Sequence, residues 1–246
     1  VMHSKARLTY NQVAAYFDGA TDAIPQDKSV HKSLNTLFQL YQTLKELRAK
    51  RHAMEFETVE TYMTFDELGG IKEILTRNDA HKLIEECMLL ANVAAAEYSL
   101  EHDIPMLYRV HEAPEFSRIQ KVRDFVKLLG LPFPEQPTQA DYQRVIEATK
   151  DRLDAPSIHA VLLRSMMQAY YGANNAGHYG LAYEAYTHFT SPIRRYPDLL
   201  LHRAIKAYLD KKVYPLSGAA LDDAGEHFSQ TERRADEASR SVTTWL

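Results

Sequence analysis

The sequence contains a single cysteine, Cys87, among its 246 residues. One thiol excludes an internal disulfide and any zinc site built from several cysteines. No apolar run approaches the roughly 20 residues that a transmembrane helix needs, and we find no secretory leader or lipidation motif. These absences predict a protein of a reducing, cytoplasmic compartment that has no membrane partner.

An excess of positive charge is also lacking. The chain has 29 Lys and Arg against 33 Asp and Glu, which gives a formal net charge of −4. This balance argues against a protein that coats nucleic acid through bulk charge, although a channel with local positive charge stays compatible with it. The sequence has no phosphate-binding Walker loop, dinucleotide fingerprint, HExxH motif or nucleophile elbow. These absences argue against a P-loop nucleotidase, a dinucleotide-binding enzyme, a zinc metalloprotease and an α/β-hydrolase.

Helical periodicity dominates what is present. With 45% hydrophobic residues, a chain of this length can bury a sizeable core. The pattern predicts a hairpin around Gly69 and Gly70 within residues 53–77 and a short buried strand in "IPMLYRVH". It predicts helices at residues 7–18, 30–51, 78–101, 114–130, 138–152, 156–172, 197–211 and 219–246. The fold class is therefore α+β and helix-rich, with a small antiparallel hairpin.

The segment "THFTSPIRRYPD" places Arg194 and Arg195 between Pro192 and Pro197. Proline favours the first turn of a helix, so we expect a tight turn between two helical starts. The free backbone N–H groups of such a turn and two guanidinium groups would together suit a phosphate or other oxyanion. The alternative is that both arginines pair with carboxylates such as Asp198 or lie in solvent.

The helix expected at 78–101 carries a second candidate feature. Its predicted core face comprises Ile84, Cys87, Met88, Ala91, Ala95 and Tyr98. The opposite ridge, formed by Glu85, Leu89, Asn92 and Ala96, has one carboxylate, one amide and little charge, which is unusual for a solvent-exposed face. The ridge either lines a channel or belongs to an Ala-rich helix that is buried on both sides, with Glu85 in an ion pair.

Aromatic residues are frequent, with 15 tyrosines. Several could stack on bases or simply form core: Tyr10, Phe56, Tyr186, His188 and Phe189. The adjacent carboxylates Asp222 and Asp223 are interpreted as surface residues rather than a metal site.

The segment "HYGLAYEAYTHFTSPIRRYPDLLLHR" resembles the signature of the RNB exoribonucleases, the ribonuclease II and ribonuclease R group. Four further motifs stand in the order expected for that family: "SKARLTYNQV", "AMEF" at 53–56, "IEECMLLAN" at 84–92 and "TERRADEASRSV". The resemblance extends over essentially the whole chain. The "RRYPD" and "TERRADEA" forms are more similar to ribonuclease R than to ribonuclease II.

The resemblance implies an α+β domain whose helices line an RNA channel. It implies processive hydrolysis of single-stranded RNA from the 3′ end, with release of nucleoside 5′-monophosphates at a Mg²⁺ site. It implies RNA, not DNA, as the partner, and a monomer. Arg194 matches the arginine that grips the phosphate near the scissile bond, and Glu85 matches an acid that contacts ribose. The remaining matched positions are RNA-contacting aromatics at Tyr10 and Phe56, and motif positions at Asn92 and Arg195.

One element of the family pattern is missing. The aspartate cluster that holds the metal in this family is expected upstream of "SKARLTY", and no such pattern occurs in these residues. We therefore interpret residues 1–246 as the C-terminal portion of one RNB catalytic domain, without its metal-binding part or the flanking OB-fold domains. The Mg²⁺ ligands are expected upstream, so this chain alone is expected to be inactive. The alternatives are a non-catalytic RNA-binding relative that has lost the metal site, and a helical scaffold without a role in nucleic-acid binding.

Overall fold

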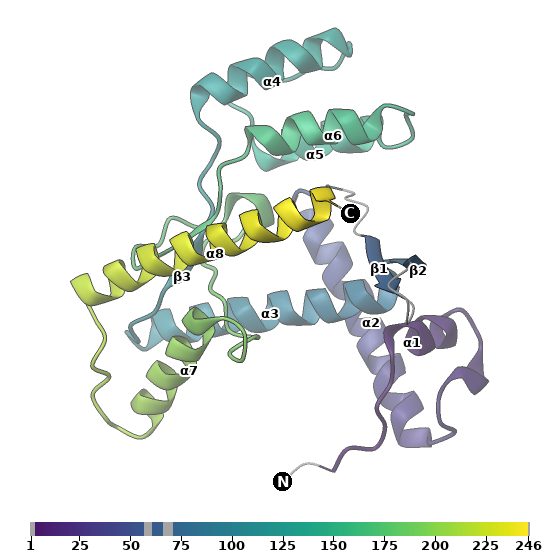
Figure 1. Cartoon of the computed structure of the whole chain (residues 1–246), viewed down its shortest axis with the longest axis vertical. Coiled ribbons are helices and arrows are strands. Elements are labelled where there is room, and N and C mark those ends of the chain that lie inside the picture. The colour runs from purple at the N-terminus through teal and green to yellow at the C-terminus, as the bar shows by residue number, and fades with distance from the viewer. Residues whose placement is uncertain (1–2, 57–60, 66–70, 246) are drawn as a thin grey trace. The chain divides into compact units, whose positions relative to one another are not determined.

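The computed structural model describes residues 3–56, 61–65 and 71–245. These residues form a helix-rich α+β structure (Figure 1), as the sequence predicts. The chain divides into two compact units. Unit 1 comprises Val1–Arg51 and Glu57–Leu89, and unit 2 comprises His52–Phe56 and Leu90–Leu246.

Unit 1 is built from helices and one hairpin. Its elements are α1 (Tyr10–Phe17), the 3₁₀ turn η1 (Thr21–Ala23), α2 (Lys28–Lys50), β1 (Thr61–Phe65), β2 (Ile71–Thr76) and the first half of α3 (Asp79–Glu101). Helix α1 begins at a capping box, because the Thr9 hydroxyl accepts the Gln12 N–H while the Gln12 side chain accepts the Thr9 N–H. Helix α2 begins where the Asp27 carboxylate accepts the N–H of Ser29 at 2.7 Å.

The predicted hairpin is confirmed. Strands β1 and β2 pair antiparallel, with Thr61 opposite Thr76. The Gly69–Gly70 turn expected between them lies outside the described residues.

Helix α3 begins directly after Asn78, as predicted. The Asn78 Oδ1 caps the helix by accepting the His81 N–H at 3.3 Å. The predicted core face of this helix is right for Ala95, which is buried, and wrong for Ile84. Ile84 is 39% exposed, whereas Ala96, from the ridge expected on the far side, is 0% exposed. Leu89 and Asn92 on the same ridge are also buried. The low charge of the ridge therefore reflects contact with the rest of the protein.

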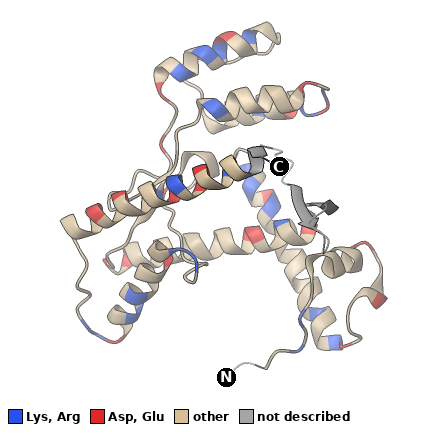
Figure 2. Cartoon of the chain, in the orientation of Figure 1, with Lys and Arg blue, Asp and Glu red and all other residues tan. Residues whose placement is uncertain are grey.

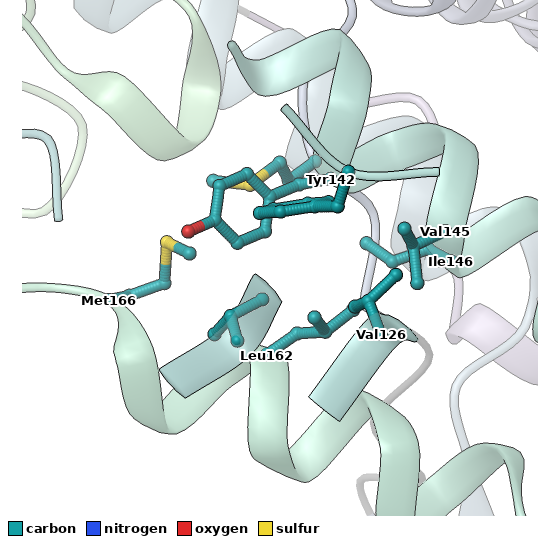
Figure 3. Packing of buried hydrophobic residues seen from close by; sticks show 9 residues of the cluster. Val126, Tyr142, Val145, Ile146, Leu162 and Met166 are labelled. Atoms are coloured by element: carbon teal, nitrogen blue, oxygen red, sulfur yellow. The ribbon is translucent and has the colours of Figure 1, made fainter. Parts of the chain in front are cut away.

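Unit 2 contains three groups of elements. The first group comprises the C-terminal half of α3, β3 (Tyr108–Val110) and α7 (Tyr196–Leu209). The second comprises α4 (Phe116–Leu128), α5 (Gln139–Thr149) and α6 (Ala155–Ser165). The third comprises β4 (Tyr170–Gly172), the 3₁₀ turn η2 (Tyr179–Leu181) and α8 (Ala219–Trp245). Helices α4, α5 and α6 enclose an apolar cluster in which Val126, Tyr142 and Leu162 are fully buried (Figure 3). Helix α4 ends as expected, with Gly130 at a positive φ of 73°.

Strand β4 corrects the sequence prediction. Residues 156–172 were expected to form one helix, but α6 ends at Ser165 and Tyr170–Gly172 pair antiparallel with β3. This pairing is non-local, so the local pattern did not reveal it. Helix α8 packs closely on β4: a Cβ at Gly225 would lie 2.7 Å from the Tyr171 carbonyl oxygen, so only glycine fits there.

Charge of both signs is spread along helices α4 and α8 (Figure 2). Among the helices that the structure describes, none has the combination of length and apolar character that crossing a bilayer requires.

Candidate functional site

Two buried polar side chains hold the loop that precedes α7. The Asn92 Oδ1 accepts the N–H groups of Phe189 at 3.0 Å and Thr190 at 3.2 Å. The Asp198 Oδ1 accepts the N–H of Ser191 at 2.8 Å. Asn92 is 3% exposed and Asp198 is 0% exposed. The loop backbone is therefore tied to the interior of unit 2 from two sides.

The turn itself is closed by one carbonyl. The Ser191 oxygen accepts the N–H groups of Arg194 at 3.3 Å and Arg195 at 3.0 Å. The prediction that the turn has free backbone N–H groups is therefore wrong for these two residues. The turn also lies outside a helix, because α7 starts at Tyr196 with Arg195 as its N-cap. The N–H groups of Arg194 and Arg195 are therefore already engaged and do not serve an anion.

The two arginines have different environments. Arg195 lies 2.8 Å from Asp198 through its Nη2 and is largely buried. Arg194 is exposed, and within the described part of the chain no carboxylate lies at ion-pairing distance from it. Asp198 also lies in the first turn of α7, where the positive end of the helix dipole stabilises a carboxylate. The pairing alternative thus holds for Arg195, and Arg194 is the cation free to meet a ligand.

A network of side chains that the sequence did not predict contacts His188, the residue before Phe189. The Tyr171 hydroxyl lies 2.8 Å from the His188 Nδ1. The Arg109 guanidinium lies over the Tyr171 ring, 4.7 Å from its centroid. Arg109 also pairs with both carboxylate oxygens of Glu232, at 2.6 and 3.1 Å.

Burial raises the pKa of Tyr171 to about 12. Burial and the nearby Arg195 and Arg109 lower the pKa of His188 to about 2. Both side chains are therefore uncharged near neutral pH.

Asn92 contacts the core of unit 2. Its Nδ2 donates to the Tyr186 hydroxyl at 2.9 Å, so both ends of the amide are engaged. Tyr186 is itself buried. Direct contact of Asn92 or Arg195 with RNA stays a prediction, and their observed contacts are internal.

Glu85 in unit 1 is paired with two arginines. Its carboxylate contacts the Arg77 guanidinium and lies 3.4 Å from the Arg48 Nη1. The next residue, Glu86, is buried and lies 2.6 Å from the same Arg48 nitrogen. The ion-pair alternative for Glu85 is therefore observed, and its contact with ribose stays a prediction. No local pattern indicates the ion pair of Glu86, because its partner is 38 positions away.

Replacing Arg48 with methionine is expected to destabilise unit 1 by about 3 kcal/mol, because it leaves the buried Glu86 carboxylate without its partner. The measurement is urea unfolding of the full-length protein, followed by separate probes in unit 1 and unit 2. The matched control is Arg144→Met, which removes an exposed arginine paired with Asp141 at 3.0 Å and should cost less than about 1 kcal/mol. Equal losses in the two variants would contradict a buried-charge role for Arg48.

The predicted aromatic contacts lie in different surroundings. Tyr10 is exposed in unit 1, and its ring stacks on His81 with centroids 3.9 Å apart. Phe56 is half-buried in unit 2 and packs against the cluster of α4, α5 and α6. Contact with RNA stays a prediction for both.

The described residues do not form a metal site by themselves. Among them, no three His, Cys, Asp or Glu side chains are grouped so that they could hold an ion. Asp222 and Asp223 are exposed on α8, as expected for surface residues. The donor set of these residues therefore does not fit Mg²⁺.

The family is established by comparison with known proteins. The RNB domain model matches residues 1–211, so the chain belongs to the RNB domain family. The resemblance noted from the motifs is thereby confirmed.

Several proteins to which the chain is similar are ribonucleases R. The chain is 46% identical to ribonuclease R of Vibrio parahaemolyticus over 262 residues, covering 100% of this chain and 31% of that protein. It is 43% identical to ribonuclease R of Escherichia coli, covering 100% of this chain and 32% of that protein. Mycoplasma genitalium RNase R, solved in complex with ribose-methylated single-stranded RNA, superimposes with a TM-score of 0.89 and 27% identity, covering 99% of this chain and 39% of that one. The chain thus spans about a third of the length of these curated relatives.

Proposed function

We propose that this chain is part of a processive, hydrolytic 3′→5′ exoribonuclease that degrades single-stranded RNA to nucleoside 5′-monophosphates. The observation that carries the proposal is the exposed Arg194 on a loop whose backbone is fixed from two sides. The ribonuclease R names of similar proteins support the reaction class. The RNA complex of the Mycoplasma protein supports the choice of ligand.

Arg194 acts as the phosphate-binding group in this proposal. A guanidinium presents a planar fork that matches two phosphate oxygens. Phosphoryl transfer is catalysed mainly by positioning and by stabilising charge on the transferred group. A loop with a fixed backbone would position the Cα of Arg194, and the guanidinium would supply the charge stabilisation.

Two predicted contacts in unit 1 belong to the same proposal. Tyr10 offers an exposed ring that can stack on a base. Glu85 would accept a hydrogen bond from a 2′-hydroxyl, a group that distinguishes RNA from DNA. Because Glu85 is engaged by Arg48 and Arg77, the ribose would have to share the carboxylate with these arginines.

Mg²⁺ dependence, a monomeric state and a cytoplasmic location belong to the same proposal. The ion would supply charge neutralisation and an activated water, with ligands contributed from outside these residues. This chain alone would then bind RNA without cleaving it.

The test is release of nucleoside 5′-monophosphates from a 3′-labelled single-stranded RNA by the full-length protein. We expect release with Mg²⁺, none with excess EDTA, and none from a DNA strand of the same sequence. Tight RNA binding without release would instead identify a non-catalytic RNA-binding relative.

A further inference from the structure

We propose that Asn92 and Asp198 are positioning residues that act through Arg194, and we refer to the two side chains together as the loop anchor. The inference rests on the proposed function, because it assigns to the loop anchor the task of fixing the phosphate-binding group. All the residues involved belong to unit 2.

The tip of the loop has no apolar packing of its own. Ile193, at the tip, is 101% exposed, and the neighbouring Arg194 is exposed as well. Apolar burial therefore cannot determine where the tip lies. Its position must come from the backbone on either side, which is where the loop anchor binds.

Asn92 fixes the N-terminal side of the loop. One amide oxygen accepts two consecutive N–H groups, those of Phe189 and Thr190. The same amide donates to the Tyr186 hydroxyl, which fixes the orientation of the side chain in the core. A buried amide that lost these bonds would incur a desolvation penalty, so the arrangement is strongly specified.

Asp198, in the first turn of α7, binds back to Ser191 before the tip and to the Arg195 side chain after it. Its Oδ1 accepts the Ser191 N–H and a charge-assisted bond from Arg195, both at 2.8 Å. Arg195 neutralises the buried carboxylate and so leaves the neighbouring Arg194 as the unpaired cation. The segment from Ser191 to Asp198 is thereby closed into a short ring with Arg194 at its surface.

A small displacement of this ring would move the guanidinium away from the phosphate. Displacement of a catalytic group by about 1 Å can lower the rate by about 100-fold. Loss of the loop anchor should therefore reduce turnover much more than it reduces RNA affinity, which is spread over many contacts along a bound strand.

The experiment compares Asn92→Leu and Asn92→Ala with Asn92→Asp in the full-length protein. The first two remove the acceptor for the loop, and we expect the rate constant for single-turnover release of monophosphates to fall by about 10- to 100-fold. RNA affinity should change by less than about threefold. Asn92→Asp keeps an oxygen for the two N–H groups and should recover most of the rate.

The matched control is Thr149→Val in α5. Thr149 is also a buried polar residue with internal hydrogen bonds, from its Oγ1 to the carbonyls of Val145 and Ile146. Its replacement should lower the thermal midpoint without changing the rate of release.

The decisive step repeats the Asn92 variants in an Arg194→Ala background. If Asn92 acts through Arg194, the two effects are not additive, and the double variant is no slower than Arg194→Ala within about threefold. Equal losses in both backgrounds, no greater loss than in Thr149→Val, or failure of both Asn92 variants to fold would each overturn the inference. An unchanged rate in Arg194→Ala alone would instead remove the proposed function of Arg194.

Discussion

Replacing Arg194 with alanine in the full-length protein is expected to lower the turnover of single-stranded RNA by about 10³-fold. The reason is that the guanidinium would stabilise charge that develops on the phosphate in the transition state. Interactions that strengthen only in the transition state lower kcat when they are removed, whereas uniform binding contributes to KM. We therefore expect RNA affinity to change by only a few-fold, measured by equilibrium binding to an uncleavable strand.

Two further variants make this result specific. Arg194→Lys keeps the charge but loses the planar fork, so its turnover should lie between those of the parent protein and Arg194→Ala. Arg164→Ala removes an exposed arginine of α6, a position distant in sequence from the loop, and should leave turnover within about twofold. A loss of affinity with unchanged turnover in Arg194→Ala would show that Arg194 only binds the strand.

Local signals in the sequence were sufficient for most of the helices. The side chain of Asn78 marks the start of α3, and Gly130 at a positive φ follows the end of α4. Such caps depend on residues within one turn of the helix end, so a single sequence contains them. The number and order of helices, and the presence of the hairpin, followed from these signals and from apolar periodicity.

Non-local contacts explain the errors. The buried face of α3 is determined by elements that are distant in the chain, and β4 exists only because β3 lies beside it. The site shows the same limit. The motif identified both Arg194 and Arg195, but only the position of Asp198 separates the paired arginine from the exposed one. Likewise, the bond from Asn92 to Phe189 joins residues 97 positions apart.

Two half-buried histidines, His178 and His188, make the stability of unit 2 sensitive to acid. Burial, His111 and Arg109 lower the pKa of His178 from 6.5 to about 3. Burial, Arg195 and Arg109 lower that of His188 from 6.5 to about 2. Their hydrogen bonds agree with neutral rings, since the His178 Nδ1 accepts the Leu181 N–H at 3.2 Å and the His188 Nδ1 lies 2.8 Å from the Tyr171 hydroxyl.

Unit 2 is accordingly expected to lose stability steeply as the pH falls below about 6.5. Between that value and about pH 3 the unfolded chain binds a proton on each histidine and the folded chain does not, so the unfolding free energy falls by about 1.4 kcal/mol per pH unit per histidine. At pH 4.5 the two together would remove about 5 kcal/mol, which is comparable to the whole stability of many domains. Urea unfolding at several pH values measures this slope.

Substitution of one histidine separates its contribution from that of the carboxylates. His188→Gln removes one titrating ring, so the slope between pH 6 and pH 4 should decrease by about 1.4 kcal/mol per pH unit. The matched control, His227→Gln, replaces a histidine that is exposed on α8 and should leave the slope unchanged. An unchanged slope in His188→Gln would mean that the folded protein accepts a proton on His188 as readily as the unfolded chain does. In that case, the His188 ring would be charged in mild acid, and the network of Tyr171 and Arg109 could not be the neutral one described for it.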